Sequence, residues 1–136
     1  MDRKIMGLMD FVKAAKSQIS EIDCAKLDAM RAEKGDLLIL DVRESSEHEQ
    51  GHLEDALLVP RGILEAAADP AYPKHVPQFV NARGRTIVIY CATGGRSAMA
   101  AATLKLMGFS EVYSLAGGIS QWSAENRSLV KEARYV

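Results

Sequence analysis

The stretch TIVIYCATGGRSAMAAATLKLMG, residues 86–108, decides the fold. Its first five residues are β-branched or aromatic, which strongly favours a strand. From Ser97 to Met107, small and apolar residues recur at the spacing of one helical face, and Gly108 is well suited to end that helix. Between the two lies a loop, residues 91–96, with two adjacent glycines. A strong strand that runs through a short loop into a helix indicates one unit of an α/β domain.

The same alternation continues on both sides of this unit. Short apolar stretches of strand length lie at 19–22, 37–40, 57–59 and 112–115. Helical patterns lie at 23–35, at 63–68 and from Gly117 through Trp122, with a helical turn near 78–81. Strands that alternate with helices pair in parallel through right-handed crossovers. We therefore expect a three-layer α/β domain.

The N-terminal residues carry a separate helical pattern. Apolar Ile5, Leu8, Val12 and Ala15 recur at helical spacing within residues 1–17, and charged residues occupy other parts of the wheel. We divide the chain into an amphipathic helical extension, residues 1–18, and one domain, residues 19–136. An apolar stripe of this kind needs a cover. We expect the helix to dock on its own domain or on a second copy, which would make a homodimer.

Composition and charge narrow the class of protein. The 136 residues suffice for one domain with its own core, and a hydrophobic fraction of 48% with 26% charged residues is typical of globular proteins. Because 17 basic and 18 acidic residues give a net charge of −1, we expect neither nucleic acid nor a membrane as partner. Asp10, Lys13 and Lys16 interrupt what would be the apolar core of a signal peptide. Since Cys24 and Cys91 are too few for a disulfide framework, we expect a reducing, cytoplasmic location.

The loop after the strongest strand carries the candidate chemistry. Ligands of open parallel sheets bind beyond the carboxyl ends of the strands. Gly94 and Gly95 permit backbone conformations in which successive N–H groups point inward and hold an anion at a helix N-terminus. A free thiol titrates near ~8.5, and such surroundings with a nearby arginine bring the pKa to roughly 3.5–7.5. Cys91 is thus the candidate nucleophile, and Arg96 a fixed charge suited to an anionic donor. The alternative is an inert, buried cysteine beside a tight turn.

Four groups of residues occur together around this loop: Asp41-Val42-Arg43-Glu44; Gly51-His52-Leu53 with Ala56; Cys91 through Ser97; and Leu115-Ala116-Gly117-Gly118 with Trp122. In this order they resemble the signatures of the rhodanese family of sulfurtransferases. The resemblance covers roughly residues 19–123. It implies a rhodanese-like domain with a five-stranded, mostly parallel sheet flanked by helices, to which the N-terminal amphipathic helix is an addition.

The resemblance also implies a mechanism that needs no metal and no organic cofactor. Cys91 would take up a sulfur atom as a persulfide, and Asp41 and Arg43 would support the domain near the loop. We expect a sulfurtransferase that moves a sulfane sulfur from a small anionic donor, thiosulfate or a persulfide, to cyanide or to a thiol, including a protein thiol. The loop residues that would bind the substrate are Ala92, Thr93, Gly94, Gly95, Arg96 and Ser97.

Two other functions are weighed against sulfur transfer. One is a binding or regulatory module on the same fold that holds a sulfur species without turnover. The other is a phosphatase or arsenate reductase, because the fold has relatives that hydrolyse phosphoesters with a cysteine and an arginine separated by five residues. Here four residues separate Cys91 from Arg96, and Tyr90 stands where cysteine phosphatases carry a histidine. The shorter loop favours the smaller sulfur atom.

Two features outside the loop could also bear on function. Arg61 follows a predicted strand end on the active edge, so it is either a second cation at the mouth of the site or a solvated surface arginine. The stretch His48-Glu49-Gln50-Gly51-His52 matches a zinc-protease pattern, which requires a helix through both histidines. Gly51 disfavours that helix, so we expect no metal site. Cys24 is expected to be a small core residue rather than a resolving thiol.

Overall fold

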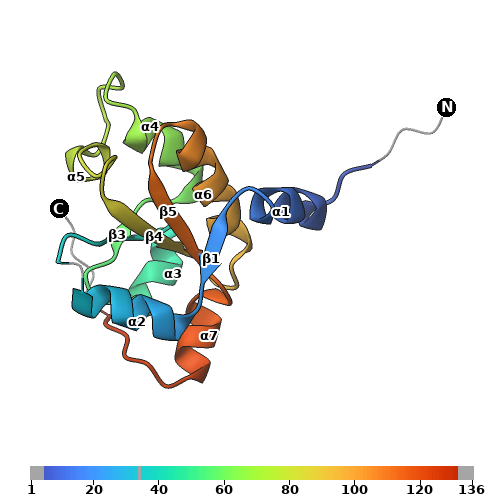
Figure 1. Cartoon of the computed structure of the whole chain (residues 1–136), viewed down its shortest axis with the longest axis vertical. Coiled ribbons are helices and arrows are strands. Elements are labelled where there is room, and N and C mark those ends of the chain that lie inside the picture. Colours follow the sequence, from blue (N-terminus) through green and yellow to red (C-terminus); the bar gives the residue numbers. More distant parts are fainter. Residues whose placement is uncertain (1–4, 34, 132–136) are drawn as a thin grey trace.

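The computed structural model describes residues 5–33 and 35–131 of the chain. Within these residues, five strands form one sheet and helices cover both of its faces (Figure 1). Each strand lies within one residue of a predicted apolar stretch, which confirms the three-layer α/β architecture. The strands are β1 (Ser20–Ile22), β2 (Leu38–Asp41), β3 (Leu57–Leu58), β4 (Thr86–Tyr90) and β5 (Glu111–Leu115).

Neighbouring strands of the sheet all pair in parallel. The strand order is β1-β5-β4-β2-β3, so β4 is central, between β5 and β2. Every residue of β2 and β4 is buried, as continuous apolar runs require in a sheet covered on both faces. Asp41 of β2 is aligned with Tyr90 of β4. Because parallel strands end at the same edge, the residues that follow β2 and β4 lie next to each other.

Helices form the two outer layers. Side chains of β4 alternate between the faces, so that Ile87 and Ile89 join the core under α4, α5 and α6, whereas Val88 and Tyr90 join the core under α2 and α7 (Figure 1). The single tryptophan, Trp122 on α7, is buried in the second core. The helices are α1 (Leu8–Lys16), α2 (Cys24–Glu33), α3 (Ser45–Glu49), α4 (Leu64–Ala68), α5 (Pro77–Val80), α6 (Gly95–Leu106) and α7 (Gly118–Ala124), with a 3-10 turn at Arg61–Ile63.

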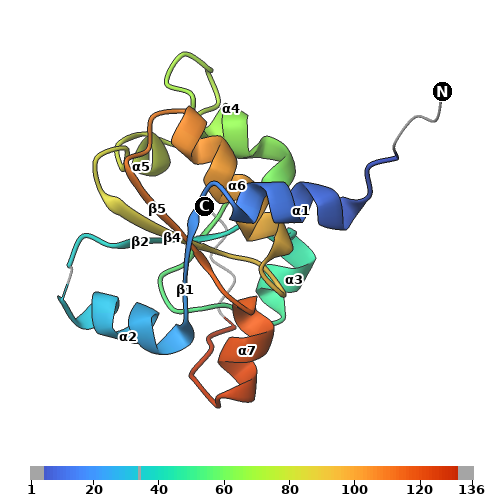
Figure 2. The same ribbon diagram turned by 45° about the vertical axis from the view of Figure 1, so that its right-hand side comes forward.

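The N-terminal helix α1 is shorter than predicted and docks on its own domain, where it packs beside α6 (Figure 2). It begins after Gly7, whose N–H donates to the Asp10 carboxylate at 2.8 Å, while residues 1–4 lie outside the described part of the chain. The predicted apolar stripe is only half covered. Val12 and Ala15 are buried, but Ile5 precedes the helix and Leu8 is 67% exposed. Part of the apolar face therefore remains open beside the domain.

Two short elements of the structure were not predicted, the helix α3 and the 3-10 turn. Helix α3 begins after Glu44, whose backbone N–H donates to the Glu47 side-chain carboxylate at 3.1 Å, a bond that caps the first turn. It ends at Glu49, and Gly51 follows at φ 147°, a backbone conformation that favours glycine. In the described part of the chain, no helix combines the length and the apolar content needed to cross a membrane.

Candidate active site

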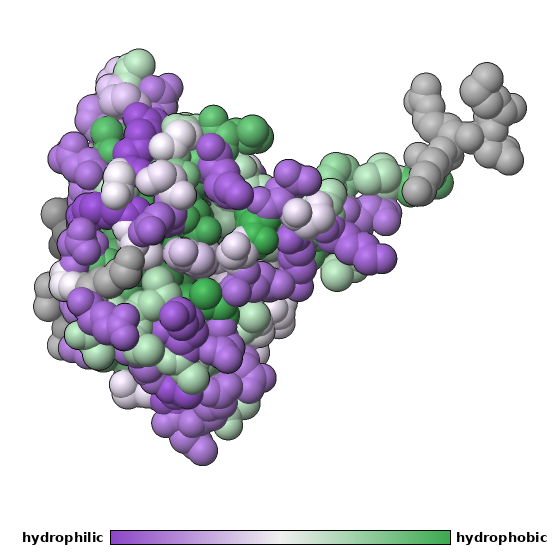
Figure 3. Space-filling view, in the orientation of Figure 1, coloured by the Kyte–Doolittle hydropathy of each residue, from purple (hydrophilic) through white to green (hydrophobic). Residues whose placement is uncertain are grey.

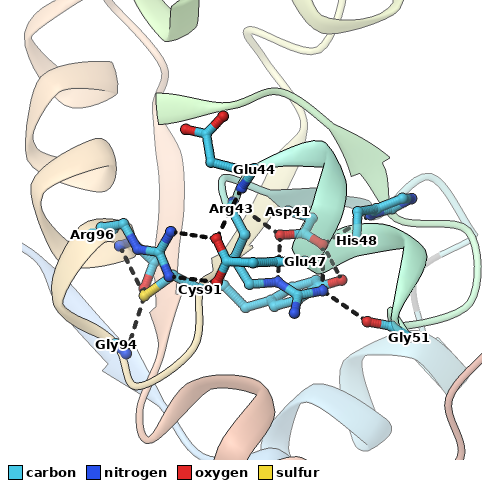
Figure 4. A network of polar contacts seen from close by, with 11 residues as sticks. Asp41, Arg43, Glu44, Glu47, His48, Gly51, Cys91, Gly94 and Arg96 are labelled. Carbon is cyan, nitrogen blue, oxygen red and sulfur yellow. Dashed lines mark hydrogen bonds and ion pairs between the residues drawn. The ribbon is translucent and has the colours of Figure 1, made fainter. Parts of the chain in front are cut away.

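The loop that follows β4 holds Cys91 at the carboxyl edge of the sheet, directly before helix α6 (Figure 4). The cysteine is a free thiol and is 1% exposed. Its position follows from the sequence around it, since the buried strand β4 fixes one side of the loop and the small residues of α6 let that helix pack closely on the sheet. Buried Ser97, Ala98, Ala100 and Ala101 form that contact face. The predicted nucleophile thus lies where parallel sheets bind their ligands.

The Cys91 sulfur is surrounded by hydrogen-bond donors from its own loop. The Gly94 N–H donates to Sγ at 3.1 Å and the Ser97 N–H at 3.4 Å, while the Ser97 hydroxyl lies 3.5 Å from it. Gly94 has φ 106°, a left-handed conformation that turns its N–H toward the sulfur and starts α6. The Ser97 hydroxyl is held in turn by Ser114 of β5 at 2.8 Å. This arrangement is a ready site for an anionic sulfur at a helix N-terminus.

The surroundings favour the thiolate form of Cys91. Burial raises the pKa of the thiol. Hydrogen bonds from the Ser97 hydroxyl and from the N–H groups of Ser97, Gly94 and Thr93 lower the pKa by more than burial raises it, so the pKa falls below its ordinary value. Hydrogen bonds, rather than a neighbouring cation, are therefore the main cause of the lowered pKa. The thiolate is the nucleophilic form of cysteine.

The start of helix α7 locks the backbone of the cysteine loop. The Ile119 N–H donates to the Cys91 carbonyl at 2.9 Å, and the Ser120 N–H donates to the Ala92 carbonyl at 3.0 Å. Gly118 permits this contact, because a Cβ atom on it would lie 2.5 Å from the Cys91 carbonyl oxygen. The carbonyls of the loop are thus turned away from the sulfur and bonded to α7, which leaves the N–H groups facing Sγ.

A buried network at the end of β2 braces the same edge. The Asp41 carboxylate accepts hydrogen bonds from Arg43 Nε at 3.0 Å and Nη2 at 2.8 Å, from His48 Nδ1 at 2.9 Å and from the Tyr90 hydroxyl at 2.9 Å (Figure 4). Burial raises the pKa of Asp41, but the bonds from Arg43 and His48 lower it below its usual range. Tyr90 directly precedes Cys91, so the network holds the residue before the cysteine. Loss of one partner from a buried ion pair typically costs about 3–5 kcal/mol.

Arg96 points to a carboxylate that sequence reasoning missed. Its Nη1 and Nη2 donate to the two oxygens of Glu47 at 2.8 and 2.9 Å, a bidentate ion pair between α6 and α3 (Figure 4). The hydrogen bond from Arg96 lowers the pKa of Glu47 to about 2. The predicted free cation is therefore paired with a carboxylate, and the leading causes that lower the thiol pKa are the hydrogen bonds of the loop. Because 49 residues separate Glu47 from Arg96, only the fold could reveal the pair.

The structure does not bring Arg61 to the cysteine. Its guanidinium donates to Glu65 at 2.9 Å, one helical turn away, and to Thr103 of α6 at 3.3 Å. The prediction placed it at the active edge because it follows β3, but the 3-10 turn at Arg61–Ile63 turns the chain back along α6. Of the two predicted roles for Arg61, the structure favours the surface one.

The histidine pair and the second cysteine have structural surroundings. His48 and His52 stack with ring centroids 3.7 Å apart. His48 Nδ1 is hydrogen-bonded to Asp41 at 2.9 Å, and His52 Nδ1 is hydrogen-bonded to the His48 carbonyl at 2.9 Å. The helix that the zinc pattern requires ends before Gly51, and within residues 5–33 and 35–131 no group of three or more histidine, cysteine, aspartate or glutamate side chains is placed to hold a metal. Cys24 is 1% exposed in the core under α2, as predicted.

A pocket of about 230 Å³ opens above the sulfur. Its floor and one wall come from the cysteine loop and α6, namely Cys91, Thr93, Gly95, Arg96 and Met99. The opposite wall comes from α1 and consists of Leu8, Met9, Val12 and Lys16. Thr93, Gly95 and Arg96 of the predicted substrate-binding loop thus line this pocket, while Gly94 and Ser97 contact the sulfur. The N-terminal helix, for which no role in the site was predicted, completes the rim.

Comparison with known proteins identifies the segment around this pocket. The model of the rhodanese-like domain family matches residues 23–125, a range that begins after α1 and contains the whole cysteine loop. A curated sulfurtransferase of Allochromatium vinosum is 33% identical over 112 residues, which cover 82% of this chain and 95% of that protein. A tRNA uridine(34) hydroxylase of Cronobacter sakazakii is 29% identical over 136 residues, but the chain spans only 38% of its length.

Solved structures show the same fold. A Rhodopseudomonas palustris protein of unknown function, described as a possible tyrosine phosphatase, superposes with a TM-score of 0.85 and 31% identity, covering 96% of this chain and 99% of that chain. The human single-domain sulfurtransferase superposes with a TM-score of 0.65 and 25% identity, covering 79% of this chain and 97% of that chain. The first of these alignments extends over nearly the whole chain.

Proposed function

The chain belongs to the rhodanese-like family, and from that premise we propose that it moves a sulfane sulfur from an anionic donor to a thiol or to cyanide through a persulfide on Cys91. One observation supports this proposal more than any other. The Cys91 sulfur is the acceptor of several hydrogen bonds from its own loop, which lower the pKa of the thiol despite its burial. A buried sulfur held in this way is suited to carry a negative charge both before and after it takes up a second sulfur.

The reaction runs in two half-reactions. In the first, the Cys91 thiolate attacks the outer sulfur of thiosulfate, a new S–S bond forms, and sulfite leaves with the electron pair of the broken bond. In the second, cyanide or a thiolate attacks the outer sulfur of the persulfide and leaves as thiocyanate or as a new persulfide. Cys91 returns as thiolate, and neither step needs an oxidant, a reductant or a bound metal. The N–H groups of Gly94 and Ser97 face the sulfur of the free cysteine, where they support an anionic sulfur.

The donor and the acceptor of this proposal are classes of molecule. Thiosulfate and persulfides both present an anionic sulfur to the loop, and the acceptor class includes protein thiols. Lys16 lies on the rim of the pocket and Arg96 on its wall, where they favour an anion, although Glu47 balances the charge of Arg96. We place the reaction in the cytoplasm, because a reducing compartment keeps the free Cys91 thiol available.

A phosphatase is the second candidate, because a structural relative is described as a possible one. Four residues stand between Cys91 and Arg96, and both oxygens of Glu47 accept hydrogen bonds from the Arg96 guanidinium. Both features favour a sulfur atom over a phosphoryl group. The hydroxylase activity of the tRNA-modifying relatives belongs to proteins of which this chain matches little more than a third, 38% in one case.

Mass spectrometry and a turnover assay test the proposal. After exposure to thiosulfate, the protein should carry an adduct of about 32 Da, one sulfur atom, on Cys91, and it should then convert cyanide to thiocyanate. Cys91→Ser should abolish both, since a hydroxyl cannot form a persulfide, whereas the matched variant Cys24→Ser should keep both because Cys24 lies in the core under α2.

Each other outcome has a distinct meaning. Turnover retained by pure Cys91→Ser protein would overturn the proposed mechanism. An adduct on Cys91 without release to cyanide or to any thiol tested would indicate a module that binds sulfur without turnover. Hydrolysis of p-nitrophenyl phosphate, lost in the Cys91→Ser variant and present without sulfur transfer, would establish the phosphatase instead.

A further inference from the structure

One wall of the pocket above Cys91 comes from a helix that lies outside the family domain. The family model begins at residue 23, whereas α1 spans Leu8–Lys16 and lines the pocket opposite the cysteine loop. We propose that this wall makes the site selective for organic sulfur donors with an apolar body, with Leu8 and Met9 as the specificity-determining residues. The inference rests on the proposed sulfur transfer and names the substrate class of the same site.

The wall is held firmly against the domain. Val12 and Ala15 of α1 are 3% and 8% exposed where the helix packs beside α6 (Figure 2). A Val12 methyl lies 3.4 Å from the position that a Cβ atom would occupy on Gly95, the first residue of α6. Helix α1 therefore contacts the cysteine loop itself, and the residues one turn earlier on α1 are carried to the mouth of the pocket.

The side chains at this mouth have an apolar and a cationic part. Leu8 and Met9 are 67% and 66% exposed, so they offer apolar surface that a bound molecule can remove from water. In Figure 3 the projecting N-terminal part of the described chain shows hydrophobic residues interspersed with hydrophilic ones. On the same rim, the Lys16 ammonium is 3.7 Å from the Glu21 carboxylate, a loose pair at the surface. A donor with an apolar body and an anionic sulfur head matches both parts.

The size of the pocket points the same way. Its volume of about 230 Å³ is the volume that roughly seven or eight water molecules occupy in liquid water. Thiosulfate, with five heavy atoms, fills only part of the pocket and leaves Leu8 and Met9 exposed to solvent. A thiosulfonate, in which an alkyl or aryl group replaces one oxygen, places the same reactive sulfur over Cys91 and covers the apolar wall as well.

The chemistry with such a donor balances without any other reactant. The Cys91 thiolate attacks the terminal sulfur of the thiosulfonate and forms the S–S bond of the persulfide. The bond between that sulfur and the sulfonyl sulfur breaks, and the organic sulfinate leaves with its electron pair. Charge is conserved, because two monoanions react to give two monoanions.

A series of donors tests the proposal on the intact chain. Thiosulfate and the methane-, butane- and benzenethiosulfonates are assayed by thiocyanate formation, and kcat/KM is measured for each. In the native protein we expect kcat/KM to rise at least about tenfold from the methane to the butane compound, since each methylene removed from water contributes roughly a factor of four. In the double variant Leu8→Gln, Met9→Gln this rise should fall to about twofold or less.

For each donor, kcat/KM of a variant is divided by kcat/KM of the native protein, so that differences in the intrinsic reactivity of the donors cancel. Phe11→Gln is the matched control, because Phe11 is also an exposed apolar residue of α1, 54% exposed, but does not line the pocket. It should keep the native donor preference. The melting temperature of each variant shows whether α1 is still docked, and Val12→Gln supplies the profile of an undocked helix.

Three results would overturn the inference. The first is an equal kcat/KM for all thiosulfonates, and the second is an unchanged preference in the double variant. The third is a dimer of the native protein that the double variant and Phe11→Gln both dissociate without altering donor preference, which would assign the apolar face of α1 to a second copy. Failure of every donor to load Cys91 would instead refute the proposed function, so the two failures are distinguishable.

Discussion

Ser97 contributes to the reactivity of Cys91 more directly than Arg96 does. Both its hydroxyl and its N–H lie near the sulfur, whereas the Arg96 guanidinium is bound by Glu47. A hydrogen bond to a charged group contributes about 1.5–3 kcal/mol, and one pKa unit corresponds to about 1.4 kcal/mol. Ser97→Ala, which keeps the N–H bond, should therefore raise the pKa of the Cys91 thiol by roughly one unit, and Arg96→Ala should raise it less.

The pH dependence of alkylation measures this difference. Only the thiolate reacts, so the rate with neutral iodoacetamide rises with pH and reaches half its plateau at the thiol pKa. Because that pKa is lowered in the native protein, the midpoint should lie below that of an ordinary cysteine and move upward in the Ser97 variant. A Cys24→Ser background leaves Cys91 as the only thiol. A larger shift for Arg96→Ala than for Ser97→Ala would contradict the role of the loop hydrogen bonds.

At the same scale, the sequence predicts local relations and misses distant ones. Cys91 and the loop residues could be predicted because strand, glycines and helix follow one another in the chain. Glu47 could not, because its partner Arg96 lies 49 residues away and neither residue type is unusual at a surface. The predicted effect of Arg96 on the thiol pKa stays a prediction, and the ion pair with Glu47 is what sequence could not supply. A positive charge read from sequence has no partner until the fold supplies one.

At the scale of elements, the junction between α7 and the cysteine loop depends on Gly118. Both Gly118 and Gly108 have positive φ, at 57° and 93°, so an alanine at either position strains the backbone by about 1–2 kcal/mol. Only at Gly118 would the added Cβ also meet the Cys91 carbonyl, at 2.5 Å, whereas at Gly108 its nearest neighbour is an Arg83 nitrogen at 3.9 Å. Gly118→Ala should therefore displace the loop, and Gly108→Ala should not.

Kinetics and urea unfolding separate the two variants. We expect Gly118→Ala to lose at least about tenfold in kcat/KM for thiosulfate, since small displacements of reacting groups cost factors of this size, and Gly108→Ala to lose activity less than about twofold. Both should be less stable to urea. Equal activity losses in the two variants would show that α7 does not position the loop.

The elements differ in how far their sequences revealed them. The strands were predictable because each is an apolar run of strand length, and burial on both faces makes that signal strong. Helix α3 has only five residues and none of them is buried, so it left no apolar periodicity to detect. The 3-10 turn at Arg61–Ile63 likewise lacks buried residues, so the sequence left the two roles of Arg61 open. Helix α1 begins at Leu8, later than the apolar pattern predicted, because the hydrogen bond from the Gly7 N–H to the Asp10 carboxylate caps the helix there.

At the scale of the whole molecule, the two cores share one sheet and should unfold together. Leu104 of α6 belongs to the core on one face, and Trp122 of α7 belongs to the core on the other. Leu104→Ala should cost about 2–5 kcal/mol, because it leaves a cavity at a fully buried site. Strands β2 and β4 contribute to both cores, so the loss should lower the urea midpoint reported by Trp122 fluorescence and by far-UV circular dichroism equally.

The same helix supplies the control. Leu106 is 91% exposed, so Leu106→Ala should change stability by less than about 0.5 kcal/mol. Trp122 is the only tryptophan in the chain, which makes its fluorescence a probe of the second core alone. Separate midpoints for the two signals in the Leu104 variant would mean that the faces of the sheet unfold independently.

Helix α1 and the cysteine loop contribute different parts of the pocket, and this separation has a consequence for evolution. Cys91, its loop and the hydrogen-bond network around it lie within residues 23–125, which match the family model, while one wall of the pocket comes from helix α1, which precedes that stretch. Selection can therefore retune what reaches the sulfur by substitutions in nine residues, Leu8–Lys16, without disturbing the inherited chemistry. Proteins descended from one such domain can then differ in the sulfur donors they accept while they keep the same mechanism.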